Sequence, residues 1–279
     1  MYADLHLHST FSDGTDTPLE LCNLAKNCGL SIISITDHDT VSGQKALSHG
    51  QLPNGIRMVS GVEISIEVNR KMTHILGYYI DLYDKRLENF IHYISAEKTA
   101  STKANFENAC ANNVFSYEWE RVLELNPECP RISGVNVVKA MQIDGYEVPG
   151  MGVWEMFHKY FWPENDNYIS RATLTGYDAI DTIKAIGGIS VIAHPKALND
   201  DDIVLDLIKH GAKGLEVYHP IHNDEDAKKY IQMAESKNLF VSGGTDWHGK
   251  NNGNDVTRFA MKGLSHENYE ILKLTDFHK

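Results

Sequence analysis

The stretch YADLHLHSTFSDGT, residues 2–15, carries the strongest signal for the fold of this chain. Its first part, residues 2–7, predicts a strand that leads into the polar loop S-D-G-T. Side chains alternate along a strand, so the H-x-H pair of His6 and His8 faces one side of it. Asp13 follows in the loop. The stretch therefore predicts a strand whose imidazoles point the same way, with a carboxylate beyond its end.

Six further segments are predicted strands because they are short, rich in Ile and Val, and bounded by Gly and Asp. They are Ser31–Thr36, Met58–Ile66, Thr73–Tyr79, Ile189–Ala193, Gly214–Tyr218 and Leu239–Gly243. Helical patterns lie between several of them, at Leu19–Cys28, Gly176–Ile186 and Asp224–Lys237. Alternating strands and helices indicate parallel strands with helical crossovers. The fold class predicted is α/β, with the strands in a closed or nearly closed barrel.

The middle of the chain breaks this alternation. Between residues 87 and 171 we predict no strand, and the periodic patterns there are helical. These patterns cover Asn89–Asn113, Tyr117–Leu125, Gly134–Ile143 and Gly152–Tyr160. We therefore expect a catalytic barrel from residues 1–86 and 172–279, with an all-helical insertion at 87–171 that caps the substrate.

Composition limits the classes of function. The net charge of −12 disfavours an extended nucleic-acid surface, which needs clustered Lys and Arg, but leaves room for a small phosphorylated substrate. The four cysteines form no C-x-x-C pair, so a zinc ribbon is not predicted. No signal peptide and no membrane-spanning stretch is visible. We expect a soluble, cytoplasmic protein.

Nine polar residues follow the predicted strands in a regular way. Most lie at or just beyond the C-terminal end of a strand, where α/β barrels build their active sites. They are His6, His8, Asp13, His38, Glu63, His74, His194, Asp246 and His248. His6 lies within its strand, and His74 lies at the start of the predicted strand, so these two are exceptions. Buried charges are costly unless paired or metal-bound, so the set as a whole predicts a metal centre.

The ligand types narrow the chemistry. Imidazole and carboxylate without thiolate suit manganese, iron or zinc. A carboxylate such as Glu63 can bridge two metals, and two metals can clamp the attacking and leaving oxygens of a phosphoryl displacement. We expect two or three divalent ions of this kind.

Six motifs together resemble one known family. D-L-H-L-H-S-T-F-S-D-G-T, I-T-D-H-D-T, G-V-E-I, H-I-L-G-Y, I-A-H-P and G-G-T-D-W-H-G resemble the polymerase-and-histidinol-phosphatase (PHP) family, and they span nearly the whole chain. The resemblance implies a distorted, TIM-like (β/α)7 barrel. It implies one metal on His6, His8, Glu63 and Asp246, a second on Glu63, His74 and His194, and a third on Asp13, His38 and His248. Some relatives have His in place of Asp13.

Within that family the chain looks like the branch that includes 3′,5′-nucleoside bisphosphate phosphatases. The resemblance implies hydrolysis of a phosphate ester of a small nucleotide or sugar phosphate by a hydroxide that bridges two metals. Alternatives are a phosphodiesterase that acts on a cyclic phosphate or trims short RNA from its 5′ end, a histidinol phosphatase, and a non-catalytic metal-binding module.

Supporting roles are predicted for a few more residues. Arg131 resembles the phosphate-binding Arg of the branch, Arg171 occupies a place where relatives often carry a basic residue, and Lys196 is a further candidate for phosphate contact. His219, after the sixth strand, is the candidate acid for the leaving group. Asp37 and Asp39 flank His38. We expect one of them, taken as Asp37, to orient a ligand imidazole and the other to cap the next helix.

Overall fold

The computed structural model describes residues 2–47, 52–249 and 259–273. Its strands form two sheets, one of three strands and one of five. The first sheet has the order β1 (Ala3–Leu7), β2 (Ile32–Ile35) and β3 (Arg57–Met58), all parallel. The second has the order β4 (Gly61–Val68), β5 (Lys71–Tyr78), β6 (Ile189–Ile192), β7 (Gly214–Tyr218) and β8 (Phe240–Gly243).

The strand β5 runs against its neighbours. It pairs antiparallel with β4 and with β6, whereas β6, β7 and β8 are mutually parallel. The strand β5 begins at Lys71, two residues earlier than predicted. His74 therefore lies inside the strand rather than near its start. The N-terminal half of an antiparallel strand lies beside the C-terminal ends of its parallel neighbours. His74 therefore reaches the same edge of the sheet as the other predicted ligands.

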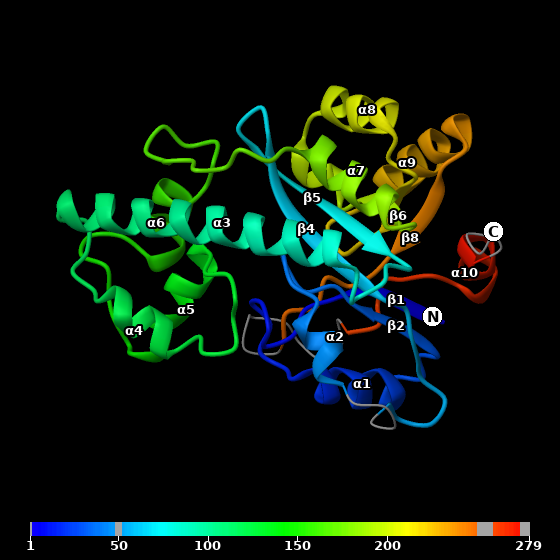
Figure 1. The fold of residues 1–279 in the computed structure, drawn as a ribbon, viewed down its shortest axis with the longest axis horizontal. Coiled ribbons are helices and arrows are strands. Elements are labelled where there is room, and N and C mark those ends of the chain that lie inside the picture. Colours follow the sequence, from blue (N-terminus) through cyan, green and yellow to red (C-terminus); the bar gives the residue numbers. More distant parts are fainter. Residues whose placement is uncertain (1, 48–51, 250–258, 274–279) are drawn as a thin grey trace.

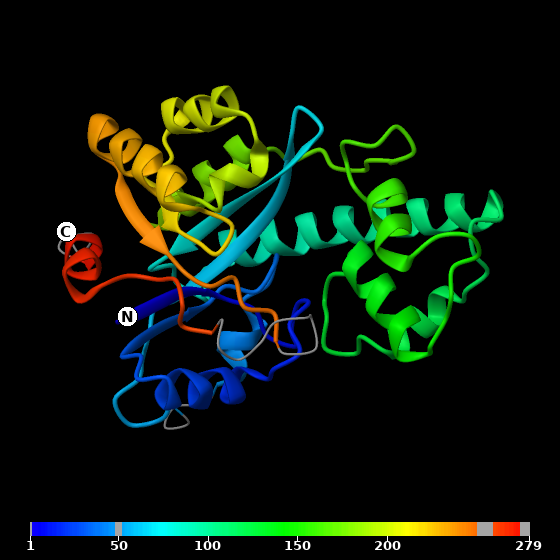
Figure 2. The ribbon, with the colours of Figure 1, turned by 180° about the vertical axis from the view of Figure 1, so that it is seen from behind.

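The helices fall into groups that cover different parts of the sheets (Figures 1 and 2). The helix α1 (Pro18–Asn27) packs on β2, and α2 (Ser42–Ala46) lies beside α1. On the five-stranded sheet, α7 (Gly176–Ala185) packs on β4, β5 and β6, and α9 (Asp224–Lys237) packs on β7 and β8. Three further helical segments are η1 (Pro195–Leu198), α8 (Asp201–His210) and α10 (His266–Lys273).

The predicted helical segment in the middle of the chain is helical in the structure. It contains α3 (Lys85–Ala111), α4 (Trp119–Glu124), α5 (Gly134–Ile143) and α6 (Val153–Tyr160). These helices share an apolar cluster of their own, built around Phe106, Trp119, Met141 and Phe157. The long α3 runs from the sheets to this cluster (Figure 1). The helices therefore stand beside the sheets with a separate core.

The mixed α/β architecture predicted from the sequence is confirmed, but the single closed (β/α)7 barrel is not seen among the described residues. The predicted strand Met58–Ile66 is two strands, because Val59 N–H still bonds to Ile33 of the first sheet, whereas β4 pairs with β5. The two sheets meet through isolated bridges, including His38 with Glu63 and Leu7 with Trp247. The strands β1 and β2 are short, and the described residues join them to the neighbouring sheet at a few positions at or just beyond their C-terminal ends.

Candidate metal centre

Four side chains from three separate parts of the chain converge where β1 ends. His6 and His8 are fully buried, as is Glu63 in β4. The Nε2 atoms of His6 and His8 each lie 3.1 Å from Glu63 Oε2. Asp246 Oδ1 completes the group at 3.3 Å from His6 Nε2 and 3.0 Å from His8 Nε2. The atoms form a compact cluster of nitrogen and oxygen donors.

The spacing of this cluster fits a metal ion. His6 Nε2, His8 Nε2 and Glu63 Oε2 are buried and have no hydrogen-bond partner among the described residues. Buried polar atoms without partners are rare in proteins. Ligands that bind one ion tetrahedrally at the usual bond lengths lie roughly 3.3 Å from one another. The geometry therefore accommodates a cation at the centre of the four residues.

A second group shares Glu63. Its other oxygen, Oε1, lies 3.0 Å from His74 Nδ1 and 3.2 Å from His194 Nε2. The two histidine nitrogens are 3.2 Å apart. These three atoms form a triangle with the edges expected of ligands around one ion. Glu63 thus presents one carboxylate oxygen to each group, as a bridging ligand does.

A third group lies on the far side of His8. Asp13 Oδ1 is 3.1 Å from His248 Nε2 and 3.8 Å from His8 Nδ1, and Asp13 Oδ2 is 3.9 Å from His38 Nε2. Ligand atoms of these four residues all lie within 4.8 Å of one another. The group is looser than the other two. The structure therefore brings all nine predicted ligand residues into one cluster.

The charges in this cluster are strongly coupled. Burial would raise the pKa of Glu63, but the nearby charges of His6, His74 and His38 outweigh it and hold that pKa well below its usual range. Burial would lower the pKa of His8, but its contacts with Asp246 and Glu63 raise it to about 10. The raised pKa of His8 and the lowered pKa of Glu63 both favour a charge pair between these two side chains.

Glu216 is a buried carboxylate that the sequence analysis missed. It lies in β7, and its Oε1 is 2.9 Å from His6 Nδ1. Its Oε2 accepts the backbone N–H of His194 at 2.8 Å. A proton on Nδ1 leaves Nε2 of His6 free to bind a metal. The signal in the sequence was a charged residue in the middle of the apolar strand G-L-E-V-Y.

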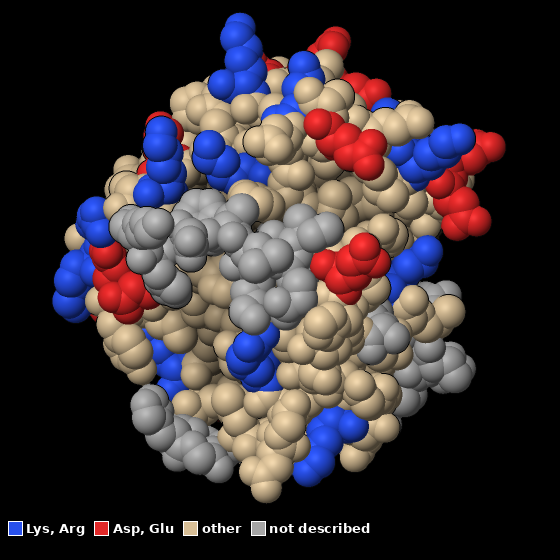
Figure 3. Space-filling model, turned by 90° about the vertical axis from the view of Figure 1, so that its right-hand side faces the viewer, with Lys and Arg blue, Asp and Glu red and all other residues tan. Residues whose placement is uncertain are grey.

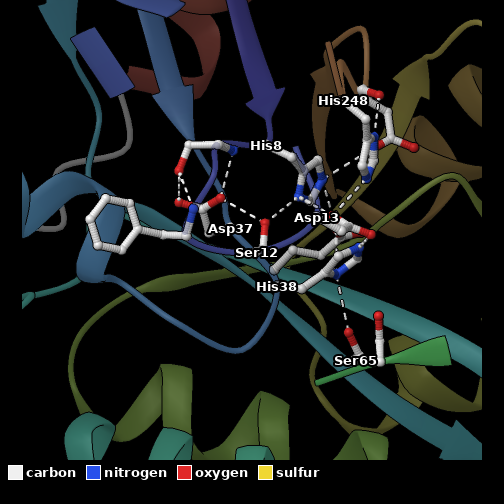
Figure 4. A network of polar contacts seen from close by, with 12 residues as sticks. His8, Ser12, Asp13, Asp37, His38, Ser65 and His248 are labelled. Carbon is white, nitrogen blue, oxygen red and sulfur yellow. Dashed lines mark hydrogen bonds and ion pairs between the residues drawn. The ribbon is translucent and has the colours of Figure 1, made fainter. Parts of the chain in front are cut away.

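Asp37 supports the site indirectly. It accepts hydrogen bonds from Ser9 N–H, Ser9 Oγ and Ser12 Oγ, each at 2.7 Å. Ser12 Oγ in turn lies 3.5 Å from His8 Nδ1, so Ser12 stands between Asp37 and His8 (Figure 4). The imidazole of His38 contacts Ser65 Oγ at 3.1 Å instead. Asp37 therefore holds the loop after β1. The sequence predicts that it orients a ligand imidazole, but its link to His8 passes through Ser12.

The backbone near the ligands is unusual. Asp246 and His194 have φ angles of 50° and 26°. Positive φ is uncommon for residues other than glycine and costs of order 1–3 kcal/mol, and such residues cluster at functional sites. Two residues before Asp246, a Cβ on Gly244 would lie 2.4 Å from His6 Cβ. A glycine is therefore required there for the backbone to approach His6.

His219 lies beside the first group. Its Nδ1 accepts the N–H of Ile221 at 3.3 Å, which leaves the ring proton on Nε2. Nε2 lies 3.4 Å from Asp246 Oδ2. The residue is buried. A proton donor thus stands next to a candidate ligand carboxylate.

A cavity opens beside Asp13, His38 and His74, and its opposite wall comes from the helices α3, α5 and α6. Two basic residues, Lys98 and Arg131, line it. Both are buried. Arg131 Nε forms an ion pair with Asp39 Oδ2 at 2.7 Å, although the angle is not that of a hydrogen bond. Asp39 therefore pairs with Arg131 and accepts Ser65 N–H at 2.7 Å.

The other two predicted phosphate contacts lie elsewhere. Arg171 is exposed, and its backbone N–H donates to Ser101 Oγ. The ammonium of Lys196 pairs with Asp226 at the start of α9. Neither residue lines the cavity next to the candidate ligands. Lys98, which the sequence analysis did not single out, does.

The surface that carries α10 shows how the charge is distributed. Basic side chains there are separated by acidic and uncharged ones, and the described residues of this face form no continuous basic stripe (Figure 3). The described side chains of this face therefore lack the clustered charge that binds nucleic-acid backbones. None of the helices within the described ranges is both long and apolar enough to cross a bilayer.

Comparisons with known proteins agree with this geometry. Residues 4–140 match the PHP domain. A 3′,5′-nucleoside bisphosphate phosphatase of Chromobacterium violaceum is 30% identical over 260 residues, which cover 90% of this chain and 88% of that protein. A phosphoribosyl 1,2-cyclic phosphate 1,2-diphosphodiesterase of Eggerthella lenta is 28% identical over 256 residues, 90% of this chain and 95% of that protein. A 5′-3′ exoribonuclease of Haemophilus influenzae is 26% identical over 253 residues, 88% of this chain and 89% of that protein.

A solved structure has the same fold over almost the whole chain. A proposed metal-dependent phosphoesterase from Bifidobacterium adolescentis superposes with a TM-score of 0.82 at 25% identity and covers 97% of this chain and 95% of its own. The fold, the His/Asp/Glu clusters suited to metal ions and these relatives define a metal-dependent phosphoesterase. The chain belongs to the PHP family.

Proposed function

We propose that the protein is a phosphomonoesterase that acts on a small nucleotide or sugar phosphate, such as a 3′,5′-nucleoside bisphosphate. The observation that carries this proposal is the cavity beside the candidate ligands, where Lys98 and Arg131 face the same space as Asp13, His38 and His74. Cationic side chains of this kind bind phosphate oxygens, and Arg does so in bidentate fashion.

The remaining wall of the cavity favours a substrate with a ring. Phe157, Phe161 and Trp162 line it, and aromatic faces stack on bases. The cavity volume of about 90 Å³ is below the roughly 300 Å³ at which ligand pockets usually begin. We infer that it takes a part of the substrate, and that residues 87–171 act as the cap that supplies this wall.

Two or three divalent ions, manganese, iron or zinc, would be held by His6, His8, Asp13, His38, Glu63, His74, His194, Asp246 and His248. Such ions neutralise phosphate charge and activate water at neutral pH. Glu63 would keep two of them adjacent through its two oxygens, and Arg131 would orient the phosphate. His219 would give the Nε2 proton to the leaving oxygen.

A second candidate function is hydrolysis of a phosphodiester. The Eggerthella lenta relative is named for a cyclic phosphate and the Haemophilus influenzae relative for RNA, and both match most of this chain. The same ligands would serve either reaction. Hydrolysis of a monoester and hydrolysis of a diester therefore differ in the leaving group and not in the metal centre.

A product screen tests the proposal. The EDTA-stripped protein is reloaded with Mn²⁺ and offered 3′,5′-adenosine bisphosphate, AMP, a ribose cyclic phosphate, histidinol phosphate and short 5′-phosphorylated RNA. We expect inorganic phosphate from a nucleotide monoester, and none from the Glu63→Gln variant. Ring opening of the cyclic phosphate or mononucleotides from RNA, without phosphate release from any monoester, would overturn the proposal in favour of a phosphodiesterase.

A further inference from the structure

The loop after β1, Ser9–Thr15, carries Asp13 and is held from two sides. On the sheet side, Asp37 accepts Ser9 N–H and Ser12 Oγ, both at 2.7 Å. Thr15 N–H bonds to the carbonyl of His248 at 3.1 Å. This side therefore ties the loop to the segments that carry His38 and His248.

The other side of the loop contacts the helical region of the chain. Cys129 Sγ donates to the carbonyl of Ser12 at 2.7 Å, and Asn136 Nδ2 donates to the same carbonyl at 3.3 Å. The Lys139 ammonium donates to the carbonyl of Asp13 itself. Three side chains from α5 and the segment before it thus bind two consecutive carbonyls, one of which belongs to the candidate ligand residue.

Some of the groups that make these contacts are closed to solvent, whereas Cys129 and Lys139 are half-buried and line a cavity of about 300 Å³. Asn136 is 1% exposed and Ser12 and Asp13 are 5% exposed. A hydrogen bond made away from water restricts its partners more strongly than one at the surface. The position of the Asp13 backbone is therefore fixed by α5 as well as by the sheet.

The metal group that contains Asp13 is sensitive to that position. Asp13 Oδ1 already lies 3.1 Å from His248 Nε2, whereas its Oδ2 is 3.9 Å from His38 Nε2. Asp13, His38 and His248 come from three different loops, so no single element sets their spacing. Binding sites need supporting contacts that hold the ligands to within roughly 0.5 Å.

We propose that Cys129, Asn136 and Lys139 are positioning residues for the metal site formed by Asp13, His38 and His248, here called the Asp13 site. The inference rests on the proposed function in taking these three residues as ligands. The same helix that faces the substrate cavity through Gly134 and Val135 thereby sets the affinity of one metal ion.

The test uses Lys139 because two substitutions separate its hydrogen bond from its charge. Lys139→Met and Lys139→Gln both remove a positive charge that opposes a nearby cation, but only Gln keeps an N–H donor. Mn²⁺ binding to the stripped full-length chain is measured by equilibrium dialysis with elemental analysis. The ion that Asp13→Asn fails to bind identifies the Asp13 site.

We expect the Met variant to bind this ion about two- to tenfold more weakly than the Gln variant, as for the loss of one hydrogen bond. Cys129→Ala does not change the charge of the side chain. It should bind the same ion more weakly than Cys129→Ser, which keeps a donor. Lys103→Met removes the same charge from an exposed position on α3 and should leave binding unchanged. Thermal melting of the stripped variants checks that each one folds.

Two results would overturn the proposal. One is equal affinity of the Met and Gln variants together with unchanged binding in Cys129→Ala. The other is a wild-type protein that binds no more Mn²⁺ than Asp13→Asn. Failure of the proposed function is a separate result, because it appears as absence of phosphate release from every substrate while the Mn²⁺ titration still compares the variants.

Discussion

Glu216 holds two of the candidate ligand residues at once, His6 through its imidazole and His194 through its backbone. Its Oε1 lies 2.9 Å from His6 Nδ1, and its Oε2 accepts His194 N–H at 2.8 Å. Partners of this kind fix the orientation of a ligand imidazole, and their loss lowers metal affinity by about 10- to 100-fold.

We therefore expect Glu216→Gln to weaken Mn²⁺ binding by about 10- to 100-fold without unfolding the protein. The amide can present only one acceptor, so one of the two contacts is lost. The Mn²⁺ titration described above measures the change. Glu235→Gln on the exposed side of α9 is the matched control. Wild-type affinity in Glu216→Gln would show that His6 does not need this partner.

His219 can be tested through the leaving group. In His219→Asn the proton donor is lost, so hydrolysis of a nucleotide, whose leaving oxygen needs a proton, should slow by about 10²- to 10⁴-fold. Hydrolysis of p-nitrophenyl phosphate should change little, because its leaving group is a stable anion. We would measure kcat for both substrates and compare the loss for the nucleotide with the loss for p-nitrophenyl phosphate. The exposed His210→Asn is the control. An equal loss for both substrates would contradict the role of an acid.

Proton release should accompany metal binding. The pKa of His8 is raised to about 10, so its ring is an imidazolium in the metal-free protein at pH 7 and must lose a proton before Nε2 can bind a cation. Metal affinity should therefore rise with pH from neutrality up to about 10. Calorimetric titration with Mn²⁺ in two buffers of different ionisation enthalpy counts the protons. A count of zero at pH 7 would contradict the coupling.

Residue types near strand ends, together with the family resemblance, predicted the candidate ligands, although His6, Glu63 and His74 lie within strands. The supporting residues were harder to find. Glu216 interrupts an apolar strand, and Lys98 lies in α3 with no motif around it. Asp37 was predicted, but its contact with the site passes through Ser12, which spacing in the sequence cannot reveal. Residues that support the ligands in this way are brought to the site by packing between different helices and strands, which the sequence does not show.

At the scale of elements, the ion pair between Arg131 and Asp39 joins the segment before α5 to the loop after β2. Both side chains are buried, at 8% and 0% exposure. Removing one partner of a buried ion pair leaves an uncompensated charge and costs about 3–5 kcal/mol. The pair therefore has a structural role besides the phosphate binding that we propose for Arg131.

Two variants separate these roles. Arg131→Met should lower the free energy of unfolding by about 3–5 kcal/mol, because the Asp39 carboxylate is left unpaired. The double variant Asp39→Asn/Arg131→Met should recover most of that loss, since Asn keeps the acceptor for Ser65 N–H and tolerates the positive φ of position 39. Urea unfolding measures stability, and KM for the nucleotide measures binding.

We expect KM to stay raised in the double variant because no guanidinium remains. A wild-type KM there would show that Arg131 acts on the fold alone. A single variant as stable as the wild type would show that the ion pair contributes nothing.

Most elements were predicted close to their observed bounds. Errors arose where tertiary pairing decides. The direction of β5 follows from its partners, and the split of Met58–Ile66 follows from the change of sheet at Val59. The helix α8 was missed although Asp200 caps it and Ile203, Val204 and Leu207 are buried on one side. The sequence therefore does carry a helical signal in this segment.

At the scale of the whole molecule, the two sheets and the helices α3–α6 enclose the same polar cluster from different sides. The sheets supply the candidate ligands through β1, β4, β5 and the loops after β2, β6 and β8. The helical region supplies Lys98 from α3, Arg131 from the segment before α5, and an aromatic wall. Closure of the strands could not be predicted from their number, because it depends on pairing near the strand ends, such as that of His38 after β2 with Glu63 in β4.

We propose that this cluster holds the metal ions of a phosphoesterase. An anomalous difference map from a crystal of the protein soaked in Mn²⁺ tests it most directly. We expect a peak between His6, His8, Glu63 and Asp246, and a second between Glu63, His74 and His194, each roughly 2.0–2.3 Å from its ligand atoms. Peaks at other places, or none at these two positions while the soaked protein binds Mn²⁺ in solution, would contradict it.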